Sequence, residues 1–272
     1  MKLNNLLTRL LSGAAYVALM LGSLYLCPQA FACVMALAMV VSMHEFYGIA
    51  AKIGVKPQRI AGLLCGIAVF AACYAGSFGL AGTSYNHIFF YLPIPLAVFM
   101  FFAELFRKKS LPFTNIAYTL LGVIYVALPF SLTSFVYKVA GVNAVCSFFV
   151  LLWANDTFAY LFGIAFGKHK MFPSISPKKS WEGYIGGILS VVAAAWALHY
   201  LFGDMELIHT VAFGVIISAT AVLADLVESM LKRSANVKDS GAIMPGHGGL
   251  LDRFDAALLS LPLVFAYMQM FM

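Results

Sequence analysis

Long apolar stretches recur along the whole chain, separated by short polar connections. A helix needs about 20 mostly apolar residues to cross a bilayer. The stretches are continuous and lack the period-two alternation of membrane β-barrel strands, which favours helices. The pattern therefore predicts about nine transmembrane helices, at 10–26, 30–49, 60–78, 88–106, 116–137, 143–166, 183–202, 208–226 and 254–272.

Composition supports this prediction, because 62% of the 272 residues are hydrophobic and only 10% are charged. A soluble domain carries roughly 25% charged residues, so lipid must be the solvent for most side chains. We expect an all-α, polytopic integral membrane protein with a single transmembrane domain over 1–272. Within it, 1–140 would hold the N-terminal helices and 143–272 the motif-bearing catalytic part. The five cysteines form no CxxC pair and indicate neither a zinc site nor a disulfide framework.

The basic residues predict the orientation. With nine spans, sixteen of the 17 Lys and Arg residues fall on one side and only Lys138 on the other. Basic residues stay on the cytoplasmic side, so we expect a cytoplasmic N-terminus and a C-terminus outside. Topology thus explains the net charge of +6. No stretch resembles a nucleic-acid-binding module, and we expect no nucleic-acid partner.

Two longer cytoplasmic loops, 167–182 and 227–253, are where chemistry is expected. If the helix before the second loop continues past the membrane, Asp225, Glu228 and Lys232 share one face. A carboxylate at the end of an apolar span is costly unless a cation or another partner meets it. A salt bridge from Asp225 or Glu228 to Lys232 is the structural alternative.

The rest of the second loop combines glycines, basic residues and acids. The glycines beside His247 leave the backbone free to approach a ligand, and backbone N–H groups in such a turn can cradle phosphate oxygens. Helix capping explains Asp255 well and Asp252 less well. Carboxylates suit Mg²⁺ and basic side chains suit phosphate, so two acidic clusters around this loop predict a metal–polyphosphate site.

The first loop follows an acid, Asp156, that lies well inside its predicted span. An intramembrane acid is a functional hypothesis by default, and a buried hydrogen bond to Asn155 or Tyr160 is the alternative. Lys178 and Lys179 are either topology anchors or phosphate contacts.

The stretch from Ser229 to Asp255 closely resembles the signature of phosphatidate cytidylyltransferases, also called CDP-diacylglycerol synthases. Met244 and Ala224 are mild departures from the usual pattern, and neither removes a charged residue. The matching residues are Ser229, Leu231-Lys232-Arg233, Lys238-Asp239, Gly241, Pro245, His247-Gly248-Gly249-Leu250 and Asp252-Arg253-Phe254-Asp255.

A second region resembles the same family, through Asn155-Asp156-Thr157, Ala159-Tyr160 and the run from Ser176 to Gly183. The resemblance therefore covers about 150–272. The first 140 residues match only in hydrophobic character and in Glu45-Phe46-Tyr47. From position alone, His44 and Glu45 are expected to be interfacial or paired with a cytoplasmic cation.

The resemblance implies a nine-helix, dimeric membrane enzyme that makes CDP-diacylglycerol and pyrophosphate from CTP and phosphatidic acid. Mg²⁺ is the implied cofactor, with a second cation as an option, and Asp225 and Asp252 are the implied metal ligands. Membrane lipids are its other expected partners. Further catalytic residues would be Lys232, Arg233, Lys238, Asp239 and Arg253, and substrate-binding residues Asp156, Lys178, Lys179, Ser180, His247, Gly248 and Gly249.

Two alternatives stay open on the sequence. A related CTP-dependent lipid kinase, or a cytidylyltransferase for another lipid, would carry a similar site. A cation-coupled transporter could use Asp156, although the chain shows neither the inverted repeats nor the paired broken helices of many transporters.

Overall fold

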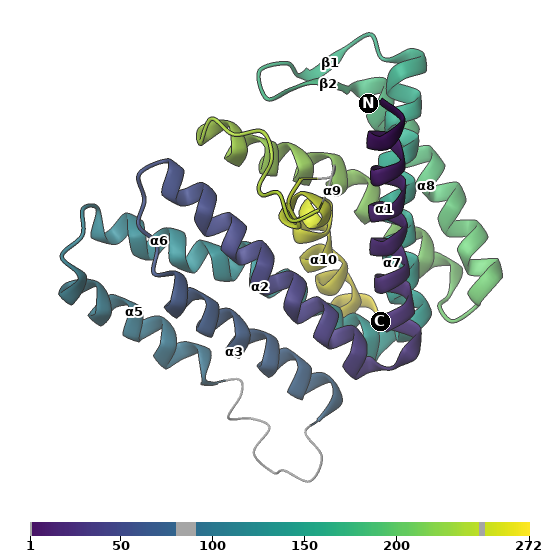
Figure 1. Cartoon of the computed structure of the whole chain (residues 1–272). Helices are drawn as coiled ribbons and strands as arrows, with labels where there is room; N and C mark the ends of the chain where they lie inside the picture. Colours follow the sequence, from purple (N-terminus) through teal and green to yellow (C-terminus); the bar gives the residue numbers. More distant parts are fainter. Residues whose placement is uncertain (1, 80–90, 245–247) are drawn as a thin grey trace. The chain divides into compact units, whose positions relative to one another are not determined.

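The computed structural model describes residues 2–79, 91–244 and 248–272 (Figure 1). His247, one of the predicted substrate-binding residues, lies outside them. The elements are α1 (Lys2–Leu26), α2 (Pro28–Lys52), α3 (Arg59–Phe78), α5 (Pro93–Arg107), α6 (Pro112–Gly122), the π-helix η1 (Val123–Ala127), α7 (Leu128–Phe166), β1 (Lys170–Phe172), β2 (Ser176–Ser180), α8 (Trp181–Phe202), α9 (Leu207–Ser234) and α10 (Leu251–Phe271).

Long apolar helices dominate the described residues, and six helical stretches there are long and apolar enough to cross a membrane. The predicted all-α membrane protein is confirmed. One of the six, Pro112–Phe166, is 55 residues long. A straight helix of that length would extend about 80 Å, far beyond a hydrocarbon core of about 30 Å. Within it, Gly141 has φ 82° and ψ 179°, a conformation that glycine adopts readily, so the helix breaks between two of the predicted spans.

The chain forms two compact units. Unit 1 comprises Met1–Lys138 and Ser234–Phe254, and unit 2 comprises Val139–Arg233 and Asp255–Met272. The boundary after residue 138 lies close to the predicted division between the N-terminal helices and the motif-bearing part. The segment 234–254 nevertheless belongs with the N-terminal helices. The expected single transmembrane domain stays a prediction.

In unit 1, α2 packs against α1 and α3, and α6 contacts α2, α3 and α5 (Figure 1). Glycines let a large side chain pass between these helices, as small residues do in membrane helix packing. A Cβ built at Gly62 would lie 2.2 Å from the Tyr47 hydroxyl oxygen. That hydroxyl donates a 2.8 Å hydrogen bond to the backbone oxygen of Thr119. Tyr47 therefore joins three helices of the unit.

A buried acid organises the same end of these helices, where the N–H of Gln58 also donates to the Thr119 hydroxyl at 2.8 Å. Glu104 in α5 is 5% exposed. Its carboxylate accepts hydrogen bonds from Gln58 Nε2 at 2.7 Å and from Asn115 Nδ2 at 2.8 Å. Arg107 completes the set with an ion pair of 2.5 Å. The polar groups that α3, α5 and α6 bring together here are thus mutually satisfied.

In unit 2, α8 presents glycines to α7. A Cβ at Gly183 would lie 2.6 Å from the backbone oxygen of Ala159, and one at Gly186 would lie 2.3 Å from Phe162 Cγ. A hydrogen bond connects α8 to α9, in which the Tyr184 hydroxyl donates to the Ala219 backbone oxygen at 2.9 Å. Close helix packing at glycines and hydrogen bonds from hydroxyl side chains across helices are typical of membrane proteins.

The polar loop between α7 and α8 contains a small antiparallel hairpin of β1 and β2. From the sequence we expected a longer polar loop over 167–182 and no strands. Strand β2 ends at Ser180, which is also the N-cap of α8 and accepts a hydrogen bond from Gly183 N–H at 3.3 Å. The hairpin therefore leads directly into the helix that follows it.

Gly186→Ala should destabilise the protein, because the added methyl group overlaps the stem of the Phe162 side chain. Overpacking of this kind costs about 1–3 kcal/mol, which exceeds the gain in helix propensity of about 1 kcal/mol. Gly48→Ala is the matched control, since nothing lies within 4 Å of its added Cβ. Thermal unfolding in detergent measures both, and equal midpoints would contradict the packing described for α7 and α8.

Candidate functional site

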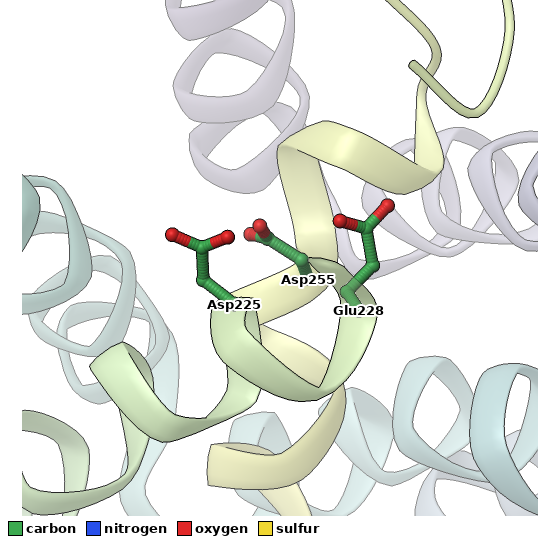
Figure 2. Close-up of side chains that lie close together, drawn as sticks. All are labelled: Asp225, Glu228 and Asp255. Carbon is green, nitrogen blue, oxygen red and sulfur yellow. The ribbon is translucent and has the colours of Figure 1, made fainter. Parts of the chain in front are cut away.

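Three carboxylates gather in unit 2, where α9 contributes Asp225 and Glu228 and α10 contributes Asp255 (Figure 2). One ligand atom from each residue lies within 4.8 Å of the other two. Asp225 and Glu228 are one helical turn apart and so share a face. Carboxylate oxygens are the ligands that hard divalent cations prefer, and this group could hold such an ion.

Lysines compensate two of these acids. Lys179 Nζ lies 2.6 Å from Asp225 Oδ2 and also donates to the Val222 backbone oxygen at 2.7 Å. Lys232 pairs with Glu228, whose side chain is fully buried. The Asp225 side chain is 39% exposed, which leaves it accessible to a ligand. The predicted face of α9 is present, and the salt bridge proposed as its alternative also forms, between Glu228 and Lys232.

Asp255 lies deeper in its helix than the sequence analysis expected. Helix α10 begins at Leu251, three residues before the predicted start, so Asp255 is in the second turn. Its Oδ1 accepts a hydrogen bond of 2.6 Å from the N–H of the next residue, Ala256. The expected capping role is therefore wrong. Asp252 and Asp255 have the same i, i+3 spacing as Asp225 and Glu228. That spacing could have revealed that Asp255 lies within a helix and not at its cap.

A pocket of about 680 Å³ opens beside Asp225 in unit 2. Three lysines of the hairpin region border it, together with Asp156, and the exposed side chains of Tyr160 and Ile164 add an apolar wall. Its lining residues are Asp156, Ala159, Tyr160, Gly163, Ile164, Gly167, Lys170, Pro177, Lys178, Lys179, Ser180, Gly183, Tyr184, Val222 and Asp225.

This pocket brings together five of the predicted site residues: Asp156, Lys178, Lys179, Ser180 and Asp225. The neighbour of Asp156, Asn155, is fully buried, and no hydrogen bond to its side-chain amide occurs within the described part of the chain. From the sequence, Asn155 was named as a possible partner for Asp156 and as part of the family resemblance, and it was not among the predicted site residues. Lys170 is a further pocket residue that it missed.

The hairpin that carries the pocket lysines is fastened at its base by Glu182, in the first turn of α8. The carboxylate accepts hydrogen bonds from the backbone N–H groups of Lys168 and His169, each at 3.1 Å. His169 Nδ1 lies 2.6 Å from the same carboxylate. The N–H of Trp181 donates to the His169 oxygen at 2.9 Å and closes the ring of contacts. Both ends of the hairpin are therefore tied to α8.

Of the other predicted site residues, Lys232 and Arg233 lie on α9 in unit 2, whereas Lys238, Asp239, Gly248, Gly249, Asp252 and Arg253 lie in the glycine-rich loop and the first turn of α10 in unit 1. Asp252 accepts hydrogen bonds from the N–H groups of Ser240 at 3.0 Å and Gly249 at 2.8 Å. Gly248 has φ 81°, which permits the turn, and a Cβ there would lie 2.7 Å from Asp252 Oδ2. Asp252 thus shapes the loop that its own helix follows. The side chains of Arg233, Lys238, Asp239 and Arg253 are exposed.

The chain is similar in sequence to known proteins. Residues 7–271 match the model of the cytidylyltransferase family. A phosphatidate cytidylyltransferase of Staphylococcus aureus (strain COL) is 43% identical over 161 residues, 58% of this chain and 60% of the relative. The corresponding protein of Staphylococcus haemolyticus (strain JCSC1435) is 39% identical over 158 residues, with the same shares.

The matched region covers 60% of the length of these curated relatives. The family model, by contrast, covers nearly the whole chain, including the α9 acids, the hairpin lysines and the glycine-rich loop. The protein is a multi-pass membrane protein that belongs to the cytidylyltransferase family.

Proposed function

We propose that this protein is a phosphatidate cytidylyltransferase, which converts CTP and phosphatidic acid into CDP-diacylglycerol and pyrophosphate for phospholipid biosynthesis. Family membership and the names of the relatives support a nucleotidyltransferase. The observation that carries the proposal is the pocket of unit 2. It combines two carboxylates and three lysines with an exposed apolar wall.

That combination suits a reaction between a nucleotide and a lipid. Lys170, Lys178 and Lys179 supply positive charge for phosphate oxygens. Tyr160 and Ile164 are 66% and 68% exposed and offer an apolar surface. Acyl chains leave the bilayer at a cost of about 0.8 kcal/mol for each CH₂ group, so the lipid substrate must enter from the side.

In the proposed reaction, a phosphate oxygen of phosphatidic acid attacks the α-phosphorus of CTP. A new P–O bond forms, the bond from the α-phosphorus to the bridging oxygen breaks, and pyrophosphate leaves with the electron pair. The attacking phosphate is already an anion and needs little help from a general base. The residues of the site therefore act mainly by positioning two anions and by offsetting their charge.

The carboxylate cluster fits the Mg²⁺ ion that the family implies. Asp225, Glu228 and Asp255 offer oxygen ligands within 4.8 Å of one another, and Asp225 also borders the pocket. Such an ion, with a second cation as an option, would neutralise charge on the CTP phosphates. Asp252 stays the second metal ligand that the resemblance implies. Lys232 would balance Glu228, while Arg233, Lys238, Asp239 and Arg253 would act around the phosphates.

The arrangement in the membrane is part of the proposal. Nine spans, a cytoplasmic N-terminus and an outer C-terminus would place both polar loops at the cytoplasmic face of the cell membrane, where CTP is available. The homodimer that the resemblance implies is also proposed.

Purified protein with phosphatidic acid and labelled CTP should release pyrophosphate and form labelled CDP-diacylglycerol only when Mg²⁺ is present. Thin-layer analysis of the lipid and the nucleotide measures both products. Release of CDP with a phosphorylated lipid would instead identify a kinase. No turnover with any lipid, together with cation flux into vesicles, would identify a transporter.

Asp225→Asn and Asp255→Asn should each reduce kcat at least 100-fold, because each removes a charged ligand of one ion. Ligands of one ion act as a unit, so the double variant should be little worse than either single one. Asp204→Asn is the control, since Asp204 is an exposed acid of unit 2 whose carboxylate accepts a hydrogen bond from Asn143. Titration with Mg²⁺ gives kcat and the metal dependence for each variant.

Asp252→Asn separates the two ligand assignments. If Asp252 holds the metal, the variant should require more Mg²⁺ for half-maximal rate. If it only shapes the loop, kcat should fall at every Mg²⁺ concentration, since the Ser240 N–H also lies 3.3 Å from Oδ1, where an asparagine would place an NH₂ group. A normal rate for Asp225→Asn and Asp255→Asn would overturn the metal assignment itself.

A cysteine placed at the exposed position of Lys238 should react with impermeant reagents only from the cytoplasmic side. The five native cysteines are first replaced. A cysteine at Lys138, also exposed, is the matched control and should react only from the opposite side. Labelling of both positions from the same side would contradict the proposed orientation.

A further inference from the structure

Glu45 is a buried acid far from the signature residues in sequence, and its contacts differ from those expected. It lies in α2 with 5% exposure. The sequence analysis expected it to be interfacial or to pair with a cation. Instead, its described hydrogen bonds all come from neutral donors of the loop between α9 and α10, and these donors belong to unit 1, as Glu45 does.

Both carboxylate oxygens of Glu45 are used. Oε1 accepts from the backbone N–H of Leu250 at 3.1 Å. Oε2 accepts from the N–H of Leu251 at 2.8 Å and from the Ser240 hydroxyl at 3.0 Å. Leu251 is the first residue of α10, and the N-terminus of a helix carries partial positive charge. The negative charge of Glu45 is therefore stabilised by hydrogen bonds and by the helix dipole.

Two loop glycines make room for this carboxylate. A Cβ at Gly241 would lie 2.2 Å from Glu45 Oε1, and a Cβ at Gly249 would lie 2.5 Å from Oε2. An alanine at either position would displace the acid or the loop. Glycine is thus required at both positions because the Glu45 carboxylate lies so close to the loop backbone.

Asp252 holds the same loop from within. Its carboxylate accepts from the N–H of Ser240, while Glu45 accepts from the hydroxyl of the same serine. The N–H groups of Gly249, Leu250 and Leu251 are likewise divided between Asp252 and Glu45. In the described part of the loop, these four backbone N–H groups and one hydroxyl all donate to protein carboxylates.

We propose that Glu45 is a positioning residue, which fixes the glycine-rich loop and the first turn of α10 so that the signature residues keep their working geometry. The inference rests on the proposed function, because the loop matters to turnover only if its residues serve the reaction. The link is direct along the chain: Lys238 and Asp239 precede Ser240, and α10 carries Asp252 and Asp255.

The side chain of glutamine cannot replace the carboxylate. Leu250 and Leu251 each present an N–H donor, one to each oxygen of Glu45. An amide has one oxygen and one NH₂ group, so in either orientation a donor would face a donor. Glu45→Gln therefore tests the charge and hydrogen bonds with little change in volume, while Glu45→Asp keeps the charge on a shorter side chain.

Hydrogen–deuterium exchange of residues 248–251 tests the positioning directly. In Glu45→Gln the N–H groups of Leu250 and Leu251 should exchange about tenfold faster or more, because they lose charge-assisted hydrogen bonds. Glu104→Gln is the matched control, a second buried acid of unit 1 whose partners lie in α5, α6 and near α3. It should leave exchange at 248–251 unchanged.

Turnover per folded molecule completes the test. We expect kcat to fall about 10- to 100-fold in Glu45→Gln, as loss of positioning does elsewhere, with partial recovery in Glu45→Asp. Gly241→Ala should also lower kcat, and Glu45→Asp should weaken that effect, because the shorter acid makes room for the added methyl group. If Glu45→Gln does not fold, Glu45→Asp and Gly241→Ala carry the same comparison.

Unchanged exchange at 248–251 in the folded variants would overturn the inference, and so would faster exchange with normal kcat. Failure of the proposed function gives a different result. The unaltered protein would then show no turnover with CTP and phosphatidic acid, while the exchange comparison would still decide whether Glu45 holds the loop.

Discussion

A carboxylate that leaves water for an apolar interior costs several kcal/mol unless donors or cations replace its hydration. In a chain where only 10% of residues are charged, that constraint decides where acids can be placed. Glu104 is held by a glutamine, an asparagine and an arginine. Glu228 is paired with Lys232, and among the described residues Glu45 accepts from a hydroxyl and two backbone N–H groups. Each buried acid therefore organises the segments that supply its partners.

The acids that contact the glycine-rich loop and the carboxylate cluster of unit 2 meet this constraint in different ways. In unit 1, the described hydrogen bonds to Glu45 and Asp252 come from backbone N–H groups of the loop and from the Ser240 hydroxyl. In unit 2, Lys179 and Lys232 pair with Asp225 and Glu228, but Asp255 brings a third carboxylate to the same place. Repulsion among three acids in a low-dielectric setting is what a divalent ion would relieve. The cluster of Asp225, Glu228 and Asp255 therefore supports the proposed metal site.

Hydrophobic pattern alone was enough to predict an all-α membrane protein, since continuous apolar runs of span length have few alternatives to helix, while the number of nine spans stays a prediction. Local spacing was enough for the shared face of Asp225 and Glu228. It failed for Asp255, because the helix start was placed three residues late and the acid was read as a cap. It could not identify the partners of Glu45, which lie 195 to 206 residues away in the chain. The hairpin was missed because its strands are short and depend on Glu182 rather than on a hydrophobic pattern.

That hairpin explains how a polar segment at a membrane surface can present ordered charge. If the lysines lay on a flexible loop, the loop backbone would lose conformational freedom when they bound a phosphate. Each residue ordered in this way costs about 1–2 kcal/mol. Here Glu182 fastens the stem, and Ser180 connects β2 directly to the first turn of α8. Lys178 and Lys179 therefore start from a fixed backbone, and Lys179 already lies against Asp225. The cost of ordering falls on folding instead of on binding, which is the condition for a site that works mainly by positioning charges.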